Sequence, residues 1–189
     1  PSMFSPSVIA SLIKKNIMSL STLKLIARKV DIFKPEDVLE TAVETNNLDI
    51  VSYLVDKKPS LLEHNNYRNE TIAHIAAAKG QLEILQYLAE KIPSILFKKD
   101  ESGKSVVHCI KDVKILKFLV EQKVIPLMCP AEYNATIVHY ALHDDNADII
   151  HYVLTKKPSL LSQERQVGTE IVRRAAAWAK INILKCIAR

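Results

Sequence analysis

The sequence predicts an all-α solenoid built from stacked helical hairpins, and three observations support this fold class. An apolar block at residues 48–54 returns at 82–88, 113–119 and 147–153, with a fainter copy at 181–187. The first residues of the copies are 34, 31, 34 and 34 positions apart, a period typical of stacked repeats. A proline then follows three of the blocks, at Pro59, Pro93 and Pro158, and stops the helix before it. About a dozen residues without helical periodicity separate each proline from the next hairpin.

The first element expected is a helical pair within residues 1–34 that caps the N-terminal end of the stack. Its apolar side chains recur at helical spacing over 6–30, which predicts two short amphipathic helices. The side chains expected to face inward are Val8, Leu12 and Ile13, followed by Leu23, Ile26 and Val30.

Residues 66–99 form the clearest repeat. Thr71 is expected to cap a first helix, and Gly80 to end it in the left-handed conformation. The block at 82–88 supplies the inner stripe of a second helix, which Pro93 terminates. The two apolar residues after each proline, such as Ile95 and Leu96, are expected to fold back under that second helix.

The later units depart from this plan in two places. The third unit is three residues short between His108 and Val113, which predicts a stubby first helix and a notch in the stack. We interpret this shortening as drift, with a binding feature as the alternative. The last unit is expected to start its first helix near Glu170, after a turn that contains Gly168 and carries Gln166 and Val167 at its tip. No polar capping helix follows that unit, so we expect the chain to be a fragment of a longer protein, with a second molecule that covers this end as the alternative.

Short motifs identify the type of repeat. Thr71-Ile72-Ala73-His74-Ile75-Ala76 is echoed at residues 105–110 and 136–141, and the turn at 100–104 reads Asp-Glu-Ser-Gly-Lys. These motifs resemble the Thr-Pro-Leu-His-x-Ala core and the preceding turn of the ankyrin-repeat family. The resemblance implies about five repeats over 35–189, at about 35–65, 66–99, 100–130, 131–164 and 165–189, with turns that project from the stack. In the second repeat, Asn69 stands where the family has glycine and is expected to take its left-handed conformation.

Composition and charge narrow the cellular context. Three cysteines without paired spacing favour a reducing compartment, and we expect a cytoplasmic protein. No apolar run is long enough to cross a bilayer. The net charge of +5 is concentrated at the two ends of the chain, so nucleic-acid or lipid binding by the basic ends remains a weaker alternative.

Catalytic and metal chemistry find little support in the sequence. His74, His108 and His139 each occupy the motif histidine, whose role in the resembled family is structural. His139 and His143 are four apart on one helix but lack a third ligand at metal-site spacing. Cys109 and His108 are adjacent and point about 100° apart on a helix, which disfavours a nucleophile with its base. We therefore expect no enzyme activity, no metal and no cofactor.

The remaining candidate is a protein-binding surface. The resemblance implies that a partner protein, not a small molecule, contacts the concave face, which consists of turn tips and the exposed ends of first helices. The candidate contact residues are Tyr67, Arg68, Glu70, Lys79, Glu101, Lys104, Tyr133, His143, Asp144 and Trp178. Richness in Lys, Ile and Asn, together with divergent repeats, is similar to ankyrin-containing effectors of intracellular bacteria, which act on host proteins in the host cytosol. The alternative function is the substrate-recognition arm of a larger enzyme whose catalytic domain lies outside this chain.

Overall fold

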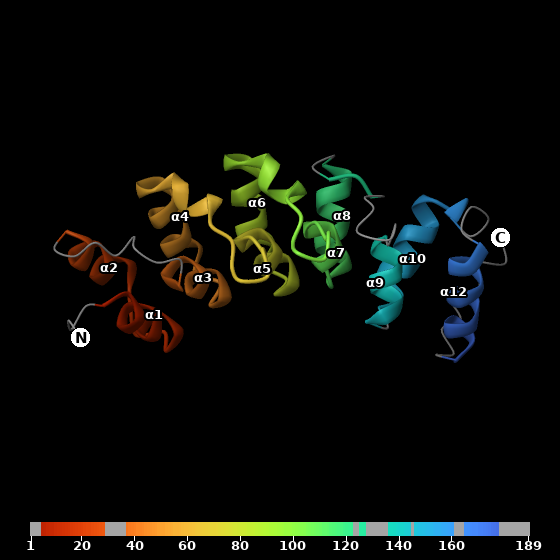
Figure 1. Ribbon diagram of the computed structural model, residues 1–189, viewed down its shortest axis with the longest axis horizontal. Helices are drawn as coiled ribbons and strands as arrows, with labels where there is room; N and C mark the ends of the chain where they lie inside the picture. The colour runs from red at the N-terminus through yellow and green to blue at the C-terminus, as the bar shows by residue number, and fades with distance from the viewer. Residues whose placement is uncertain are drawn as a thin grey trace. The chain divides into compact units, whose positions relative to one another are not determined.

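The computed structural model describes residues 5–28, 37–122, 125–127, 136–144, 146–160 and 165–177. These residues form helices and connecting turns, with no β-strand among them. The chain divides into two units, Pro1–Glu101 and Ser102–Arg189. Figure 1 shows the helices of each unit in chain order.

The N-terminal pair of unit 1 consists of α1 (Pro6–Lys14) and α2 (Leu20–Ala27). Pro6 starts α1, and the Ser19 hydroxyl caps α2 by accepting the backbone N–H of Thr22 at 3.2 Å. The prediction that Val8 faces inward is wrong, because Val8 is 38% exposed while Ile9 is completely buried. Ile9 and Ile13 lie four residues apart on the side of α1 that packs against the next first helix, and Val8 is rotated away from it. Val30 lies outside the described residues.

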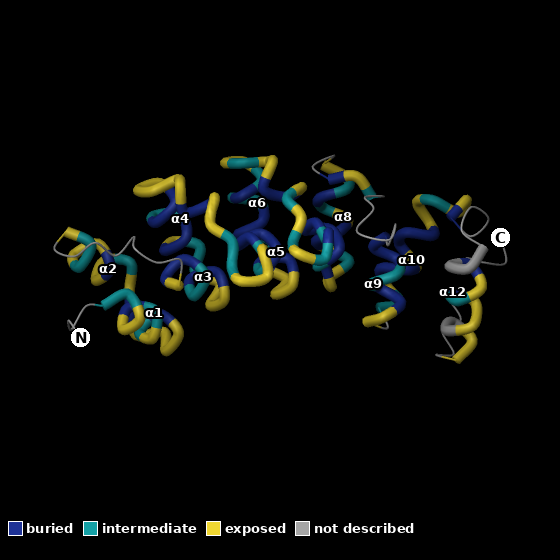
Figure 2. Tube along the Cα trace, in the orientation of Figure 1, coloured by how far each residue is buried: buried dark blue, intermediate teal, exposed yellow. Residues whose placement is uncertain are grey.

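Two further helical hairpins complete unit 1. The first comprises α3 (Asp37–Glu44), α4 (Leu48–Lys57) and the 3-10 helix η1 (Pro59–Glu63); the second comprises α5 (Ile72–Ala78), α6 (Leu82–Lys91) and the 3-10 helix η2 (Pro93–Phe97). First helices pack on first helices, α1 on α3 and α3 on α5, and α4 packs on α6. Buried residues line the sides of these helices that face one another, as Figure 2 shows. The second-helix stripes and the motif alanines therefore form the inner scaffold of the unit.

The residues after Pro59 and Pro93 fold back as predicted. η1 and η2 begin at Pro59 and Pro93 and pack against α4 and α6. Leu61 and Leu62 in η1 are buried, as are Ile95 and Leu96 in η2. Each 3-10 helix thus adds two apolar side chains beneath the second helix of its own repeat.

The first helices of unit 1 end at left-handed residues. Gly80 has φ +75°, as predicted, and Asn16 and Asn46 end α1 and α3 with φ +55°. Asparagine tolerates this conformation better than most residues, which explains how a chain with three glycines makes these turns.

Unit 2 contains α7 (Val106–Cys109), α8 (Val113–Glu121), α9 (Ile137–His143), α10 (Ala147–Lys156) and α12 (Arg165–Ala177). The prediction of a stubby first helix in the third repeat is confirmed, since α7 has four residues against seven in α5 and seven in α9. On the side of the short repeat that faces α9, a small cavity is lined by Lys111, Tyr140, Asp144 and Asn146 among others. Its volume is about 10 Å³, the lower limit for one water molecule.

The last described helix starts earlier than the sequence suggested. α12 begins at Arg165 and runs through Gly168, so Gln166 and Val167 lie in a helix and not at a turn tip. The helix-interior penalty of one glycine is about 1 kcal/mol relative to alanine, and the surrounding Arg, Gln, Glu and Ala residues favour helix. Gly168 is also buried, which indicates that it is covered by neighbouring residues.

Candidate protein-binding surface

The projecting turn at residues 66–70 is organised around the side chain of Asn66. Its Oδ1 accepts the backbone N–H groups of Arg68 at 2.9 Å and Glu70 at 3.0 Å. The backbone N–H of Asn66 donates to the Glu70 carbonyl at 3.0 Å and closes the turn. Asn69 has φ +58°, so the prediction that it replaces a left-handed glycine is confirmed. The turn therefore has a defined conformation that its own sequence specifies.

The next turn along the chain buttresses the 66–70 turn. Asn69 Nδ2 donates to the Lys99 carbonyl at 3.1 Å, and the backbone N–H of Glu101 donates to the Arg68 carbonyl at 3.0 Å. Tyr67 remains 85% exposed at the tip, and the Arg68 guanidinium lies 5.2 Å from the centre of its ring. An aromatic ring and an arginine thus project from a backbone that hydrogen bonds hold from within the turn and from the next turn.

Acidic side chains lie beside this turn. The pKa of Glu40, on α3, is raised above its ordinary value first by burial and then by the nearby charges of Glu44, Asp37 and Glu70, while His64 lowers it. Glu70 Oε2 also accepts a hydrogen bond from Asn66 Nδ2 at 2.8 Å. Glu70 therefore helps to hold the turn, a role that its prediction as a contact residue did not include. Glu40 was missed at the sequence level because nothing local marks it as partly buried.

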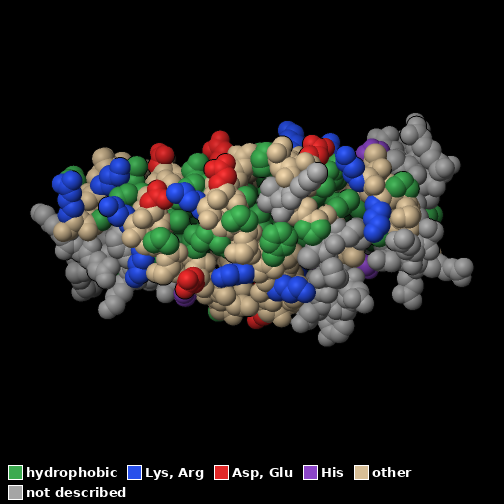
Figure 3. Space-filling model, turned by 90° about the horizontal axis from the view of Figure 1, so that it is seen from above, with side chains coloured by type: hydrophobic (Ala, Val, Ile, Leu, Met, Phe, Trp, Pro, Cys, Tyr) green, Lys and Arg blue, Asp and Glu red, His purple; other side chains and the backbone are tan. Residues whose placement is uncertain are grey.

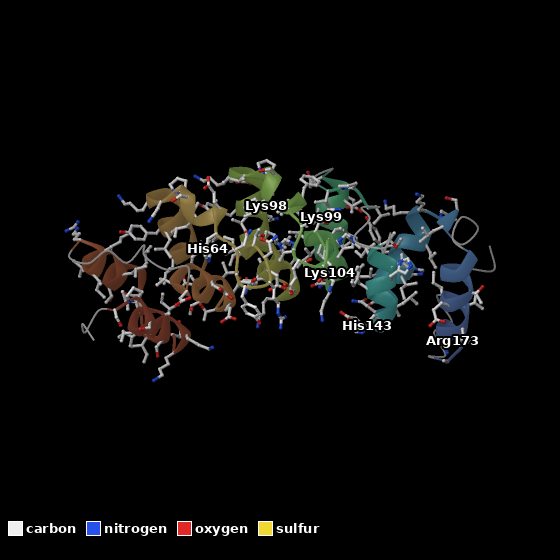
Figure 4. All side chains as sticks on the ribbon, viewed as in Figure 1. His64, Lys98, Lys99, Lys104, His143 and Arg173 are labelled. Carbon is white, nitrogen blue, oxygen red and sulfur yellow. The ribbon has the colours of Figure 1, made fainter. Side chains whose placement is uncertain are left out.

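Lys79 and Glu101 complete the predicted residues of unit 1. Both are exposed, Lys79 at the C-terminal cap of α5 and Glu101 in the turn whose backbone binds Arg68. Figure 4 shows Lys98 and Lys99 on the connection that leads to this turn. Unit 1 therefore carries Tyr67, Arg68, Glu70, Lys79 and Glu101, of which the first three share one turn.

The motif histidines hold the starts of the first helices. The backbone N–H of Thr71 donates to His74 Nδ1 at 3.2 Å, that of Ser105 to His108 Nδ1 at 3.0 Å, and that of Thr136 to His139 Nδ1 at 3.0 Å. His74 and His108 are buried, with 1% and 5% exposure. The structural role expected for these histidines is confirmed, and each imidazole satisfies a donor at the beginning of a helix.

Three of the five predicted contact residues of unit 2 are described, and contacts within the unit engage them. The Lys104 ammonium sits 4.7 Å from the centre of the Tyr140 ring. Asp144 pairs with Lys111 at 3.0 Å and with His143 at 3.0 Å, and these hydrogen bonds, that of His143 first, lower the pKa of the Asp144 carboxyl. The His143 side chain is 86% exposed at the end of α9, where Figure 4 labels it. Tyr133 and Trp178 lie outside the described residues.

Comparison with known protein families agrees with the repeated helical hairpins of unit 1. A family model described as ankyrin repeats (3 copies) matches residues 9–99, which includes most of unit 1 and begins inside α1. A search of curated proteins gives no match.

Across the described part of the chain, no three His, Cys, Asp or Glu side chains are grouped as metal ligands. Nor do its helices include one with the length and apolar character that crossing a bilayer requires.

Proposed function

Because residues 9–99 of this chain are ankyrin repeats, we propose that the chain is a protein–protein interaction module whose partner binds the 66–70 turn and the adjacent first-helix surface of unit 1. Ankyrin repeats generally serve to bind proteins. The proposal assigns no catalytic step to the described residues. Its central anchors are Tyr67 and Arg68.

The observation that carries the proposal is the 85% exposure of Tyr67 on a turn that hydrogen bonds hold in place. A rigid anchor loses little conformational entropy on binding, so more of its contact energy appears as affinity. Tyrosine and arginine are enriched among residues that dominate interface energies, and here they are adjacent. A tyrosine also combines a large apolar ring with a hydroxyl for a polar contact.

The surroundings of the turn define the chemistry of the partner. Glu70 in the turn and Glu101 in the next turn place negative charge near the anchors, and the raised pKa of Glu40 reflects burial first and then neighbouring acids that include Glu70. A complementary partner would present an apolar recess for Tyr67 with basic residues at its rim.

The proposal can be tested by affinity capture with three forms of the full chain. The first is the unaltered chain, the second carries Tyr67→Ala and Arg68→Ala, and the third carries Ile17→Ala and Lys15→Ala. The third is a matched control, because Ile17 is 67% exposed and Lys15 is an exposed cation on the α1–α2 connection. Partners should be lost with the Tyr67/Arg68 variant and retained with the control; identical capture by all three forms would refute the proposed surface.

A photo-crosslinking amino acid at position 67 identifies direct contacts in the same experiment. Eukaryotic and bacterial lysates should be used in parallel, because we also propose that the module acts as an effector on host proteins. Crosslinked partners found only in the bacterial lysate would rule against that role.

A further inference from the structure

The second helices of successive repeats are linked by an acid–lysine contact that recurs. Lys91 Nζ of α6 lies 2.9 Å from Asp56 Oδ1 of α4, and the Tyr87 hydroxyl donates to the same oxygen at 3.3 Å. In unit 2, Lys156 Nζ of α10 lies 4.0 Å from Glu121 Oε1 of α8. The lysine also lies over the tyrosine of its own helix, at 5.6 Å for Lys91 and Tyr87.

These residues occupy fixed positions along their helices. The acid is the ninth residue after the N-cap, as in Asp56 after Asn47 and Glu121 after Asp112. The lysine is the tenth, as in Lys91 after Gln81 and Lys156 after Asn146. A Tyr–Lys pair on one helix thus receives a carboxylate from the helix before it.

The contact between α2 and α4 breaks this rule. Tyr53 and Lys57 of α4 correspond to Tyr87 and Lys91, but the ninth residue after Ser19, the N-cap of α2, is Arg28. An arginine therefore stands where the other helices supply a carboxylate. Lys24 of α2 adds another cation and lies 5.5 Å from the centre of the Tyr53 ring.

An open groove of about 630 Å³ lies at this point. It is lined by Lys24, Ala27, Arg28, Tyr53, Asp56 and Lys57. Its one acid, Asp56, is bonded to Lys91 and Tyr87, and these partners hold the pKa of that carboxyl below its ordinary value. Among the described residues, no carboxylate forms an ion pair with Lys24, Arg28 or Lys57. Figure 3 shows several Lys and Arg side chains at the N-terminal end of the chain.

Helix termini explain part of this charge but not its arrangement. Arg28 and Lys57 lie in or next to the last turns of α2 and α4, where cations complement the helix dipole. Lys91 and Lys156 have the same terminal position and are nevertheless paired with an acid from the preceding repeat. The α2–α4 groove keeps the tyrosine and the lysine and replaces the acid with a third cation.

We propose that the α2–α4 groove binds a short acidic segment of a partner protein, whose carboxylate takes the position that Asp56 takes between α4 and α6. The chain itself displays the chemistry, since the equivalent Tyr87–Lys91 pair holds a carboxylate at hydrogen-bonding distance. Arg28 can bind a second carboxylate oxygen through its planar fork of donors. The groove thus accepts two or three carboxylates in an extended peptide.

The small number of cations favours a peptide over a nucleic acid. Proteins that bind duplex DNA by charge commonly neutralise about six to ten phosphates. The groove offers three cations, and the acid Asp56 in its lining further limits its positive charge. This site lies on the second helices, whereas the surface proposed for Tyr67 lies on the turns, so the two proposals can fail separately.

The test uses the full chain with fluorescein-labelled hexaglutamate as the probe, measured by fluorescence anisotropy at about 20 mM ionic strength, where screening is weak. Arg28→Asp restores the acid of the other repeats and should reduce the affinity for the probe at least about tenfold. Lys15→Asp is the matched control, because Lys15 is also a helix C-cap residue and the change in charge is identical. Its effect should stay below about twofold.

Two further measurements make the outcome decisive. In NMR spectra of the unaltered chain, the backbone amide signals of residues 24–28 and 53–57 should shift when hexaglutamate is added. Shifts confined to other residues, or an equal loss of affinity in both variants, would overturn the proposal. The labelled probe can also be displaced by a competitor. If a twelve-nucleotide oligothymidine displaces it at a lower concentration than unlabelled hexaglutamate does, the proposal is overturned in favour of nucleic acid.

Discussion

Asn146 is expected to matter more for stability than its counterpart Asn47, although both cap a second helix. Asn146 Oδ1 accepts the backbone N–H of Ile149 at 3.2 Å, and Asn47 Oδ1 accepts that of Ile50 at 3.1 Å. Asn146 also donates from its Nδ2 to the Lys111 carbonyl at 2.7 Å, and Asn47 has no equivalent bond within the described part of the chain. This contact crosses the place where the third repeat lacks three residues.

The two substitutions separate these contributions. Loss of an N-cap costs about 1 kcal/mol, so Asn47→Ala should lower the free energy of unfolding of unit 1 by about that amount. Asn146→Ala loses the cap and also a hydrogen bond worth about 1 kcal/mol, so unit 2 should lose about 2 kcal/mol. Asn146→Asp keeps an acceptor for the cap but cannot donate to Lys111, and should fall between the unaltered chain and the alanine variant.

Native-state hydrogen exchange is the suitable assay, because it reports each helix separately in a chain that has two units. The opening free energy of the Ile149 amide should fall further in Asn146→Ala than that of the Ile50 amide in Asn47→Ala. Equal decreases would show that the contact to Lys111 contributes nothing, and the short repeat would then need another explanation for its stability.

Three further substitutions test the site and the scaffold. Glu40→Gln should raise the melting temperature at pH 7, because burial and neighbouring acids raise the folded-state pKa of Glu40 and so disfavour its ionised form. This increase in melting temperature should shrink as the pH falls through the raised pKa, and an increase that does not depend on pH would contradict the explanation. His74→Ala should lower the free energy of unfolding by about 2 kcal/mol, because the buried N–H of Thr71 loses its acceptor. His143→Ala, at an exposed site, should change it by less than about 0.5 kcal/mol, and similar losses for both variants in urea unfolding would refute the capping role of His74. Asn69→Ala should weaken partner capture more than Asn69→Gly, because glycine keeps the left-handed backbone beneath Tyr67 while alanine strains it, and the reverse order would show that the amide contact to Lys99 matters more than the conformation.

Helix ends and turns could be predicted from the sequence where the conformational preference of a single residue determines them. Gly80 ends a helix and Asn69 forms a turn because few other residues adopt positive φ without strain. The exposure of Val8 was not predictable in the same way, because Val8 and Ile9 are both apolar and only packing against α3 determines which of them is buried. The helical conformation of Gly168 likewise depends on neighbours that outweigh its low propensity.

The candidate site was predictable in position but not in electrostatics. The turn motif placed Tyr67 and Arg68 at an exposed tip, and the structure shows them there. The engagement of Asp144 by Lys111 depends on contacts between successive repeats, which a linear motif does not encode. The exceptional position of Arg28 could have been found from sequence, by aligning α2 with α4 and α8 from their N-caps, but its meaning required the distance between Asp56 and Lys91.

Exposed acid–lysine contacts contribute less to stability than the buried apolar stripes of the second helices. The α2–α4 groove and the 66–70 turn can therefore change in sequence while the fold is kept. The side chains of Lys91 and Asp56 are 49% and 57% exposed, and ion pairs at such sites contribute about 0–1 kcal/mol. Leu23, Val51 and Leu85, which occupy matching positions in the second helices, are all completely buried, and truncation of one such side chain costs about 2–5 kcal/mol. An arginine in place of the acid on α2 therefore sacrifices little stability while it reverses the charge of a groove. The same reasoning applies to the turn tip, where Tyr67 can be exchanged at little cost to the hydrogen bonds that Asn66 and Asn69 make beneath it. Recognition in this chain can thus change through residues that the scaffold does not need.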